Sequence, residues 1–119
     1  MPDSAHWLQW PGRENYLDAH RRLGAGDLDR AITAFTEAIG PEGRTYSDEE
    51  RPFVAAAWIN LAGAIDRLGD ARAALVVYDK AFAKFAGDGA MMRQHPWLQS
   101  SFAGARTRRD WLAERAVDV

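Results

Sequence analysis

Cysteine is absent from this chain of 119 residues, so neither disulfide bonds nor thiolate chemistry is available to it. Long apolar runs are absent as well. None approaches the roughly 18 residues of a membrane span, and the first residues lack the basic and apolar regions of a signal peptide. The net charge of -2 gives no overall attraction to nucleic acid or anionic lipid. These absences predict a cytoplasmic protein without a membrane partner, and scarce Lys beside abundant Arg and Ala is typical of GC-rich bacterial genomes.

Motifs of known enzyme classes are also absent. His6, His20 and His95 are scattered along the chain, and no HExxH motif, glycine-rich phosphate loop or nucleophile elbow occurs. The acidic segment 48–50 is explained by a solvated helix start, where negative charge is favourable. An isolated His20 is better explained as a polar contact than as a base or a ligand. We therefore expect no catalytic residue, no cofactor and no metal site.

What the chain does contain is an internal repeat. One segment, starting at Leu23, reads LGAGDLDRAITAFTEAI, and another, starting at Arg67, reads RLGDARAALVVYDKAF. Aligned on the pairs Gly26-Asp27 and Gly69-Asp70, they share small and aromatic positions: Ala31 with Ala74, Phe35 with Tyr78, and Ala38 with Ala81. Small residues at these intervals, with an aromatic between them, are what two closely packed helices need.

The second copy of the repeat is preceded by an amphipathic segment. Apolar residues recur there at intervals of three, four and seven, as expected for one face of a helix, at Trp58, Leu61, Ala62 and Ile65. The Gly69-Asp70 pair then ends this helix and starts the next, because Gly adopts the left-handed conformation readily and Asp is a favourable N-cap. With 47% apolar residues, the chain is predicted to form one all-helical domain with a buried core.

These features resemble the tetratricopeptide repeat (TPR) family, whose pattern of Trp, Leu, small, aromatic, Ala, aromatic and Ala is met closely by residues 58–81. The first unit matches well in its second helix and partly in its first, where Asp18 and Arg22 take places that are usually apolar. The resemblance implies antiparallel helix-turn-helix repeats stacked as a short right-handed superhelix. It divides a single domain, 1–119, into an N-terminal arm 1–12, a repeat 13–39, a linker 40–51, a repeat 52–86 and a C-terminal half-repeat or capping helix 95–117.

The spacing of the two units departs from the standard repeat. Their Gly-Asp pairs stand 43 residues apart, against about 34 in a TPR. The excess lies in residues 40–52, which have no apolar period and therefore predict a loop. Within this loop Ser47 and Glu50 have the spacing of a capping box, and Pro52 suits a helix start. The long linker resembles the longer-period repeats of the kinesin light chain type.

A final helix is predicted from Pro96 to about Ala116. When Pro96 is aligned with Pro52, the apolar residues of this helix match those of the second unit's first helix: Phe102 with Trp58, Ala105 with Leu61, and Leu112 with Leu68. A terminal half-repeat covers the apolar side of the last hairpin in a repeat stack. We expect the helix to act as such a cap, with Trp97 or Trp111 as its anchor.

The resemblance implies that function resides in a concave groove lined by the first helix of each unit, where family members commonly hold a peptide or a helix of a partner protein. The residues that face it are expected to be Arg13, Tyr16, Leu17, His20, Ile59, Asn60, Gly63 and Arg67. An Asn at the place of Asn60 often bonds the partner's backbone, since its amide both donates and accepts. Gly63 would let that backbone approach closely. Two simpler interpretations stay open, namely that Gly63 serves tight helix packing and that Asn60 is solvated.

The carboxylate clamp of chaperone-binding TPR domains is not matched. That clamp needs Lys and Asn in the first unit, Asn in the second, and Lys and Arg in the third. Tyr16 and His20 occupy the first two places, and the last helix has no Lys. A mixed groove of this kind suits a partly apolar segment with an acidic residue better than a bare C-terminus. We expect a non-catalytic interaction module with a protein or peptide partner.

Two alternatives remain at this stage. One is a homodimer or larger scaffold assembled through exposed aromatic rings, because five tryptophans are many for this length; four lie outside the predicted core, at Trp7, Trp10, Trp97 and Trp111. The other, less favoured, is weak nucleic-acid binding through a C-terminal cluster near Trp111, composed of Arg106, Arg108 and Arg109. Three arginines are few, and Asp110 and Glu114 dilute their charge.

Overall fold

The computed structural model describes residues 4–116. The regular structure in this part of the chain is helical and includes no strand, which confirms the all-helical prediction. The first three residues of the predicted arm and residue 117 of the predicted capping helix lie outside the described residues. The elements are α1 (Ser4–Gln9), α2 (Arg13–Gly24), α3 (Leu28–Ile39), α4 (Arg51–Leu68), α5 (Ala71–Ala81), the π-helix η1 (Phe82–Ala86), α6 (Gly89–Gln94) and α7 (Pro96–Ala116).

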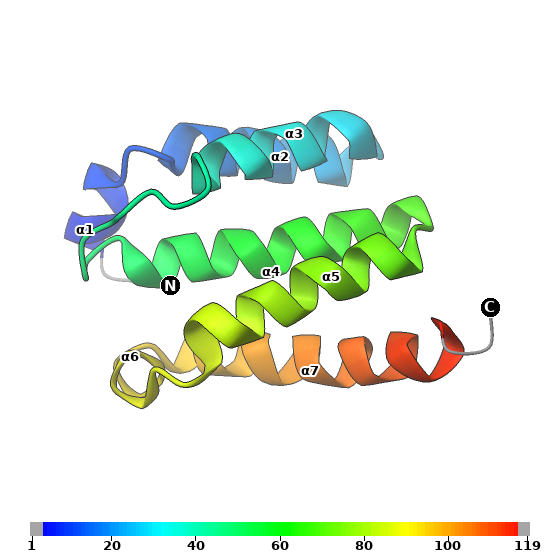
Figure 1. Ribbon diagram of the computed structural model, residues 1–119. Coiled ribbons are helices and arrows are strands. Elements are labelled where there is room, and N and C mark those ends of the chain that lie inside the picture. Colours follow the sequence, from blue (N-terminus) through cyan, green and yellow to red (C-terminus); the bar gives the residue numbers. More distant parts are fainter. Residues whose placement is uncertain (1–3, 117–119) are drawn as a thin grey trace.

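The long helices pack in chain order. Contacts join α2 to α3, α3 to α4, and α4 to α5, and α7 contacts both α4 and α5. Figure 1 shows α2 and α3 in one layer, α4 and α5 in the next, and α7 beyond them. In the same view α2, α4 and α7 run in one direction, while α3 and α5 return in the other. None of the described helices combines the length and the apolar character that crossing a membrane requires.

Glycine forms the two turns that the repeat predicted. Gly26 and Gly69 have φ angles of 79° and 99°, in the left-handed region that L side chains rarely adopt. After the second turn, Asp70 caps α5, because its side chain accepts a hydrogen bond of 3.0 Å from the backbone N–H of Ala73. The predicted turn chemistry is confirmed in full at this second junction.

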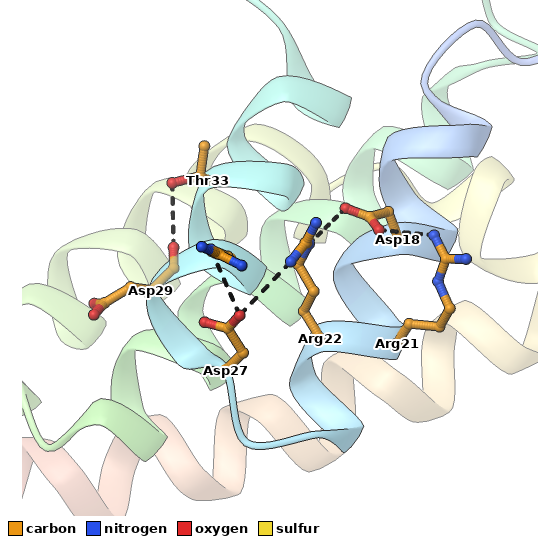
Figure 2. Close-up of polar contacts among 7 residues, drawn as sticks. Asp18, Arg21, Arg22, Asp27, Asp29 and Thr33 are labelled. Carbon is orange, nitrogen blue, oxygen red and sulfur yellow. Dashed lines mark hydrogen bonds and ion pairs between the residues drawn. The ribbon is translucent and has the colours of Figure 1, made fainter.

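The first junction differs in how its aspartate is used. Asp27 makes no capping bond to α3. Its carboxylate lies 3.6 Å from Arg22 and 3.8 Å from Arg30, so ion pairing replaces capping (Figure 2). Asp27 therefore stands at the N-cap position of α3 without the side-chain cap that Asp70 supplies at the second junction. Figure 2 also explains the polar residues of α2: Asp18 pairs with Arg22 at 2.8 Å and with Arg21 at 2.7 Å, so these side chains satisfy one another on the surface.

The linker before α4 is held by local hydrogen bonds. The backbone N–H of Ser47 donates to the Glu50 carboxylate at 3.3 Å, and the backbone N–H of Glu50 donates to the Ser47 hydroxyl at 3.2 Å. This is the predicted capping box. The Arg44 guanidinium donates to the Ile39 carbonyl at 3.2 Å and ties the loop to the end of α3. Pro52 is the second residue of α4, where its missing N–H costs nothing.

The segment after η1 is more structured than the sequence indicated. The sequence assigns residues 87–94 to neither repeat nor to the final helix, but α6 lies within them. Asp88 starts this short helix by accepting a hydrogen bond of 3.1 Å from the backbone N–H of Met91. This side-chain cap and the two buried methionines, Met91 and Met92, stabilise the six residues of α6.

The core lies between α3, α4, η1 and α7, and its largest fully buried side chains include Phe35, Phe53, Phe85 and Leu98. Trp58, assigned to the core from the sequence, is half-buried, with the Lys84 ammonium 5.6 Å from its ring centroid. The arm folds onto this core as a short helix: Trp10 is 3% exposed and its ring stacks 5.7 Å from Phe53.

The last helix packs on the second hairpin through one of the two expected anchors. The ring of Trp97 stacks on Phe53 with centroids 6.4 Å apart, whereas Trp111 is 42% exposed. Leu112 is 3% exposed, but its aligned counterpart Leu68 is 49% exposed. The alignment of α7 with α4 therefore holds along the first turns and fails at the end, where α4 closes into a turn and α7 continues.

Two ion pairs fasten α7 to both helices of that hairpin. Arg108 donates two hydrogen bonds to Asp66 of α4, at 2.6 and 3.0 Å. Arg109 donates to Asp79 of α5 at 2.8 Å. Because the pairs reach two different helices, they fix the lateral position of α7 over the seam between α4 and α5.

Candidate binding groove

Hydrogen bonds join helices α2, α4 and α7 in turn. The Asn60 amide donates to the Tyr16 hydroxyl at 2.9 Å, across 44 positions of the sequence. Arg67 donates to the Leu23 carbonyl at 3.5 Å, also across 44 positions. The pair made by Arg108 reaches back 42 positions to α4. Side-chain contacts at offsets of 44 and 42 residues thus join α2 to α4 and α4 to α7.

An apolar cavity of about 260 Å³ opens near the first turns of α4 and α7. Helix α1 contributes one wall and α7 the opposite one, with α2 and α4 between them. The side chains that line it are Trp7, Tyr16, Leu17, His20, Phe53, Ala56 and Trp97. Three of the eight predicted groove residues, all from α2, therefore meet at one cavity.

Tyr16 is the central residue of this site. Its ring lies 5.5 Å from both Trp7 and Trp10, and its hydroxyl accepts the Asn60 hydrogen bond. Burial raises the pKa of Tyr16 to about 12, because the phenolate would lose its hydration, and the Asn60 hydrogen bond offsets only part of this rise. Tyr16 thus forms a wall of the cavity and also joins α2 to α4.

Asn60 is already engaged within the chain. Its amide nitrogen donates to the Tyr16 hydroxyl and to the Ala56 carbonyl, each at 2.9 Å. Both of its donors are therefore used. Only the acceptor oxygen of the Asn60 amide is left for a partner. The alternative that Asn60 is simply solvated is not supported, because its side chain is half-buried and hydrogen-bonded within the chain.

His20 and Leu17 form the outer edge of the cavity. The His20 ring lies 4.6 Å from Tyr16 and 5.3 Å from Phe35, edge to face in both cases. Partial burial against these rings lowers the pKa of His20 from its usual 6.5, because the charged form is desolvated. The imidazole is consequently neutral at neutral pH. Leu17 is 37% exposed, which leaves an apolar side chain accessible at the rim.

The two remaining predicted groove residues of α4, Ile59 and Gly63, differ in their surroundings. Ile59 is half-buried and packs against the core, so it contributes little accessible surface to the groove. Gly63 has room around it, because a Cβ placed there would meet only the Tyr78 hydroxyl, at 3.9 Å. The interpretation that Gly63 is required for tight helix packing therefore has no support in the contacts.

Two arginines flank the cavity at different distances. Arg13 lies over the Trp7 ring, 5.9 Å from its centroid, and pairs with Glu14 at 2.7 Å. Arg67 lies further along the groove, is exposed, and has no carboxylate partner in the described part of the chain. Positive charge is thus available beyond the apolar cavity.

Sequence reasoning missed four lining residues: Trp7, Phe53, Ala56 and Trp97. Phe53 and Trp97 each follow the proline that opens their helix, so the alignment of Pro52 with Pro96 already pairs them. That pairing was the available signal. The buried indole N–H of Trp97 has no hydrogen-bond partner within the described residues.

Comparison of the chain with models of known protein families, with curated proteins and with solved structures finds no significant match. The site is therefore interpreted from its own chemistry. Within residues 4–116, no three side chains of the metal-ligating types gather where they could hold one ion. The groove offers an apolar cavity and, beyond it, the Arg67 guanidinium, which has no carboxylate partner in the described part of the chain.

Proposed function

We propose that this chain is a non-catalytic protein-interaction module of the TPR type, which binds a peptide segment or a helix of a partner on the face formed by α2, α4 and α7. The observation that carries the proposal is the open apolar cavity on the inner helices, about 260 Å³ in volume. The hydrogen bonds that join these three helices support a superhelical stack. Pockets that bury one large apolar side chain commonly dominate the energy of protein interfaces.

The partner is proposed to carry a large apolar anchor residue. The cavity walls are aromatic and aliphatic, and the neutral His20 adds no charge to them. A buried charged anchor would lack a counterion here and would be strongly disfavoured.

The partner is further proposed to carry an acidic residue at a defined distance from its anchor. Arg67 is the unpaired cation of the groove, and it lies 11 residues beyond Ala56 on the same helix. At 1.5 Å per residue this separation is about 16 Å. An extended peptide spans that length in about five residues and a helix in about eleven.

The nucleic-acid alternative has less support than the protein partner. Arg108 and Arg109 face carboxylates of their own chain, and Arg106 lies over the Phe82 ring at 4.2 Å. Phosphate binding would have to displace the two ion pairs, which position α7. Self-association through tryptophan is also less favoured, because only Trp111 among the five is largely exposed.

A display selection, in which random peptides take the place of the partner, tests the proposed function. Peptides selected on the wild-type chain are expected to share a large apolar residue and an acidic residue with a preferred spacing. Leu17→Glu places a charge at the cavity rim, where the side chain is 37% exposed, and is expected to weaken the selected peptides at least tenfold. The matched control is Val76→Glu on α5, 55% exposed and outside the groove, with an expected change below twofold.

Two outcomes would contradict the proposal. One is a selection that yields no shared apolar anchor. The other is an equal loss of peptide binding in Leu17→Glu and Val76→Glu, with both variants retaining the circular dichroism of the parent. Either result would place recognition elsewhere on the molecule.

A further inference from the structure

The long linker, which the groove does not use, closes a second cavity. This cavity also measures about 260 Å³ and is formed by the end of α3, the first half of the linker, α4 and the α5–η1 junction. Trp58 and Leu61 line it, whereas the groove cavity uses Phe53 and Ala56 of the same helix. The two cavities therefore use different residues of α4.

Unneutralised positive charge is concentrated at this second cavity. Lys80 and Lys84 are the two lysines of the whole sequence, and both line it. Neither makes an ion pair with a carboxylate that the structure describes. Arg44 contributes from the linker, although Glu50 lies 3.4 Å from it, and the one carboxylate in the lining is Glu42. Three cations thus face two carboxylates, Glu42 in the lining and Glu50 beside Arg44, and the two lysines carry the charge that no carboxylate neutralises.

Aromatic rings hold two of these cations at the cavity wall. The Lys84 ammonium lies 5.6 Å from the Trp58 ring centroid, and the Arg44 guanidinium lies 5.4 Å from that of Tyr46. A cation–π contact positions a cation without cancelling its charge, unlike a carboxylate. The charge of Lys84 therefore remains available to an anion, whereas that of Arg44 is shared with Glu50. Lys84 belongs to the π-helix η1, a departure from α-helical geometry that is frequent at functional sites.

The linker wall is preformed. Its capping box and the bond from Arg44 to the Ile39 carbonyl fix the chain at both ends. The Tyr46 ring packs on the buried Phe85, with centroids 6.3 Å apart. Gly40 and Gly43 have φ angles of 86° and 83°, so the two bends of the loop use conformations that other residues rarely adopt. A ligand would not have to order this wall, which lowers the cost of binding.

We propose that this second cavity binds a phosphate monoester of a small organic group. Lys80, Lys84 and Arg44 surround the phosphate, whose two negative charges match an excess of cations better than a single carboxylate does. The organic group lies against the apolar part of the lining, Ile39 and Leu61. The volume limits the ligand to a small molecule or to one modified side chain of a protein.

Phenyl phosphate and inorganic phosphate are the probes for a titration of the isotope-labelled full chain by nuclear magnetic resonance at low salt. Phenyl phosphate is expected to shift amide signals of residues 39–46 and 80–84, and to bind at least threefold more tightly than inorganic phosphate. The double variant Lys80→Gln/Lys84→Gln is expected to weaken it at least fivefold. The matched control, Arg93→Gln/Arg106→Gln, removes the same charge from exposed cations outside this cavity, and a change below twofold is expected.

Three results would overturn the proposal: shifts spread over the whole surface, equal weakening in the two double variants, or equal affinity for the two probes. The first two results would show that phosphate is attracted to positive charge anywhere on the surface. The third would show that the organic group of the ester contributes nothing to binding. A capped phosphotyrosine peptide identifies the source of the ester. If it binds more tightly than phenyl phosphate, the ligand is a modified protein side chain, and the reverse order assigns a free metabolite.

Discussion

Tyr16 links the chemistry of the groove to the stability of the fold. Its hydroxyl receives the Asn60 amide, and its ring forms part of the cavity wall. From the sequence, both residues were expected to serve the partner alone. The contacts instead make them part of the junction between α2 and α4, so substitutions of Tyr16 change folding and binding together. This is why Leu17, at the accessible rim, is the better residue for a test of recognition.

The titration of Tyr16 predicts an alkaline loss of stability. Its pKa rises from 10.0 in the unfolded chain to about 12 in the fold, so the favourable contribution is complete below pH 10 and is lost as the pH rises towards 12. Two pKa units correspond to roughly 2–3 kcal/mol. Urea denaturation between pH 9.5 and 11.5 is expected to show this decline in the wild type and to lack most of it in Tyr16→Phe.

Tyr78 provides the internal control for that experiment. Burial raises the pKa of this residue too, and it is present in both proteins. Any alkaline decline common to wild type and Tyr16→Phe therefore includes the part from Tyr78. Identical declines in the two proteins would show that Tyr16 contributes nothing to the pH dependence, so that its pKa is the same in the folded and the unfolded chain.

Three cavity residues of α2 are among those that the TPR resemblance, counted from the Gly-Asp turn, predicts for the groove, whereas Arg13, predicted with them, is not in the lining. The other walls come from segments distant in sequence. Trp7 reaches the cavity through the arm, whose docking depends on the stacking of Trp10 against Phe53. Neither contact has a local sequence signature. Asp27 illustrates the same limit, since its capping role was lost to two arginines whose side chains compete for its carboxylate.

At the scale of single elements, Asp88 is the residue on which α6 depends. It caps α6 and also lies 2.9 Å from Arg51 of α4, which in turn donates to the Lys84 carbonyl at 2.9 Å. Asp88→Ala is expected to lower the free energy of unfolding by about 1–2 kcal/mol. Asp88→Asn keeps the cap and should cost less. Thermal and urea unfolding measure both, with Asp48→Ala in the exposed linker as a control that leaves stability within about 0.5 kcal/mol.

Asp88 also predicts how the stability of the fold changes at acidic pH. The backbone N–H of Met91, and after it Arg51, lowers the pKa of Asp88 below 3.8. Its stabilising contribution is therefore present above pH 3.8 and is lost as the pH falls through the depressed value. A D88A variant that matched D48A in stability would show that α6 does not depend on its cap.

Helix α7 is expected to be required for a soluble fold. It buries Leu98, Phe102 and Leu112 against the second hairpin. A chain that ends after Gly89 would expose the apolar surface of α4 and α5, and we expect an insoluble or partly unfolded product. Size-exclusion chromatography and thermal melting measure this outcome. Cooperative melting of a soluble truncated chain near the parent temperature would show that α7 is not a cap.

The helices were largely predictable because each begins or ends at residues with a strong local preference. The glycine turns fix the junctions of both hairpins, and prolines lie at the starts of α4 and α7. What the sequence did not reveal was η1 and α6. A π-helix has no compositional signature, and α6 is too short for an apolar period, so its existence depends on one cap and on packing with α7.

For the whole molecule, the two proposals assign separate binding roles to two cavities. The groove cavity is apolar and lies between α1, α2, α4 and α7, whereas the second is cationic and depends on the linker that lengthens the repeat. Under the second proposal, the residues that lengthen the spacing between the two units have a binding role. Stacking of the helices alone would not require them. Because the cavities share α4 but no lining residue, loss of the lysines should leave peptide binding unchanged.

The oligomeric state follows from how the tryptophans are covered. Four are buried or half-buried within the chain, which leaves Trp111 as the basis for a homodimer. Its ring lies beneath the Arg108 and Arg115 guanidinium groups, at 4.2 and 3.7 Å, so much of its surface is already covered by cations. We therefore expect a monomer of 13.3 kDa in light scattering across a concentration series from 10 µM to 1 mM. A mass that rises with concentration in the wild type and stays constant in Trp111→Ala would establish the homodimer instead. Burial of the Trp111 ring between two copies would then outweigh the repulsion between the arginines around it.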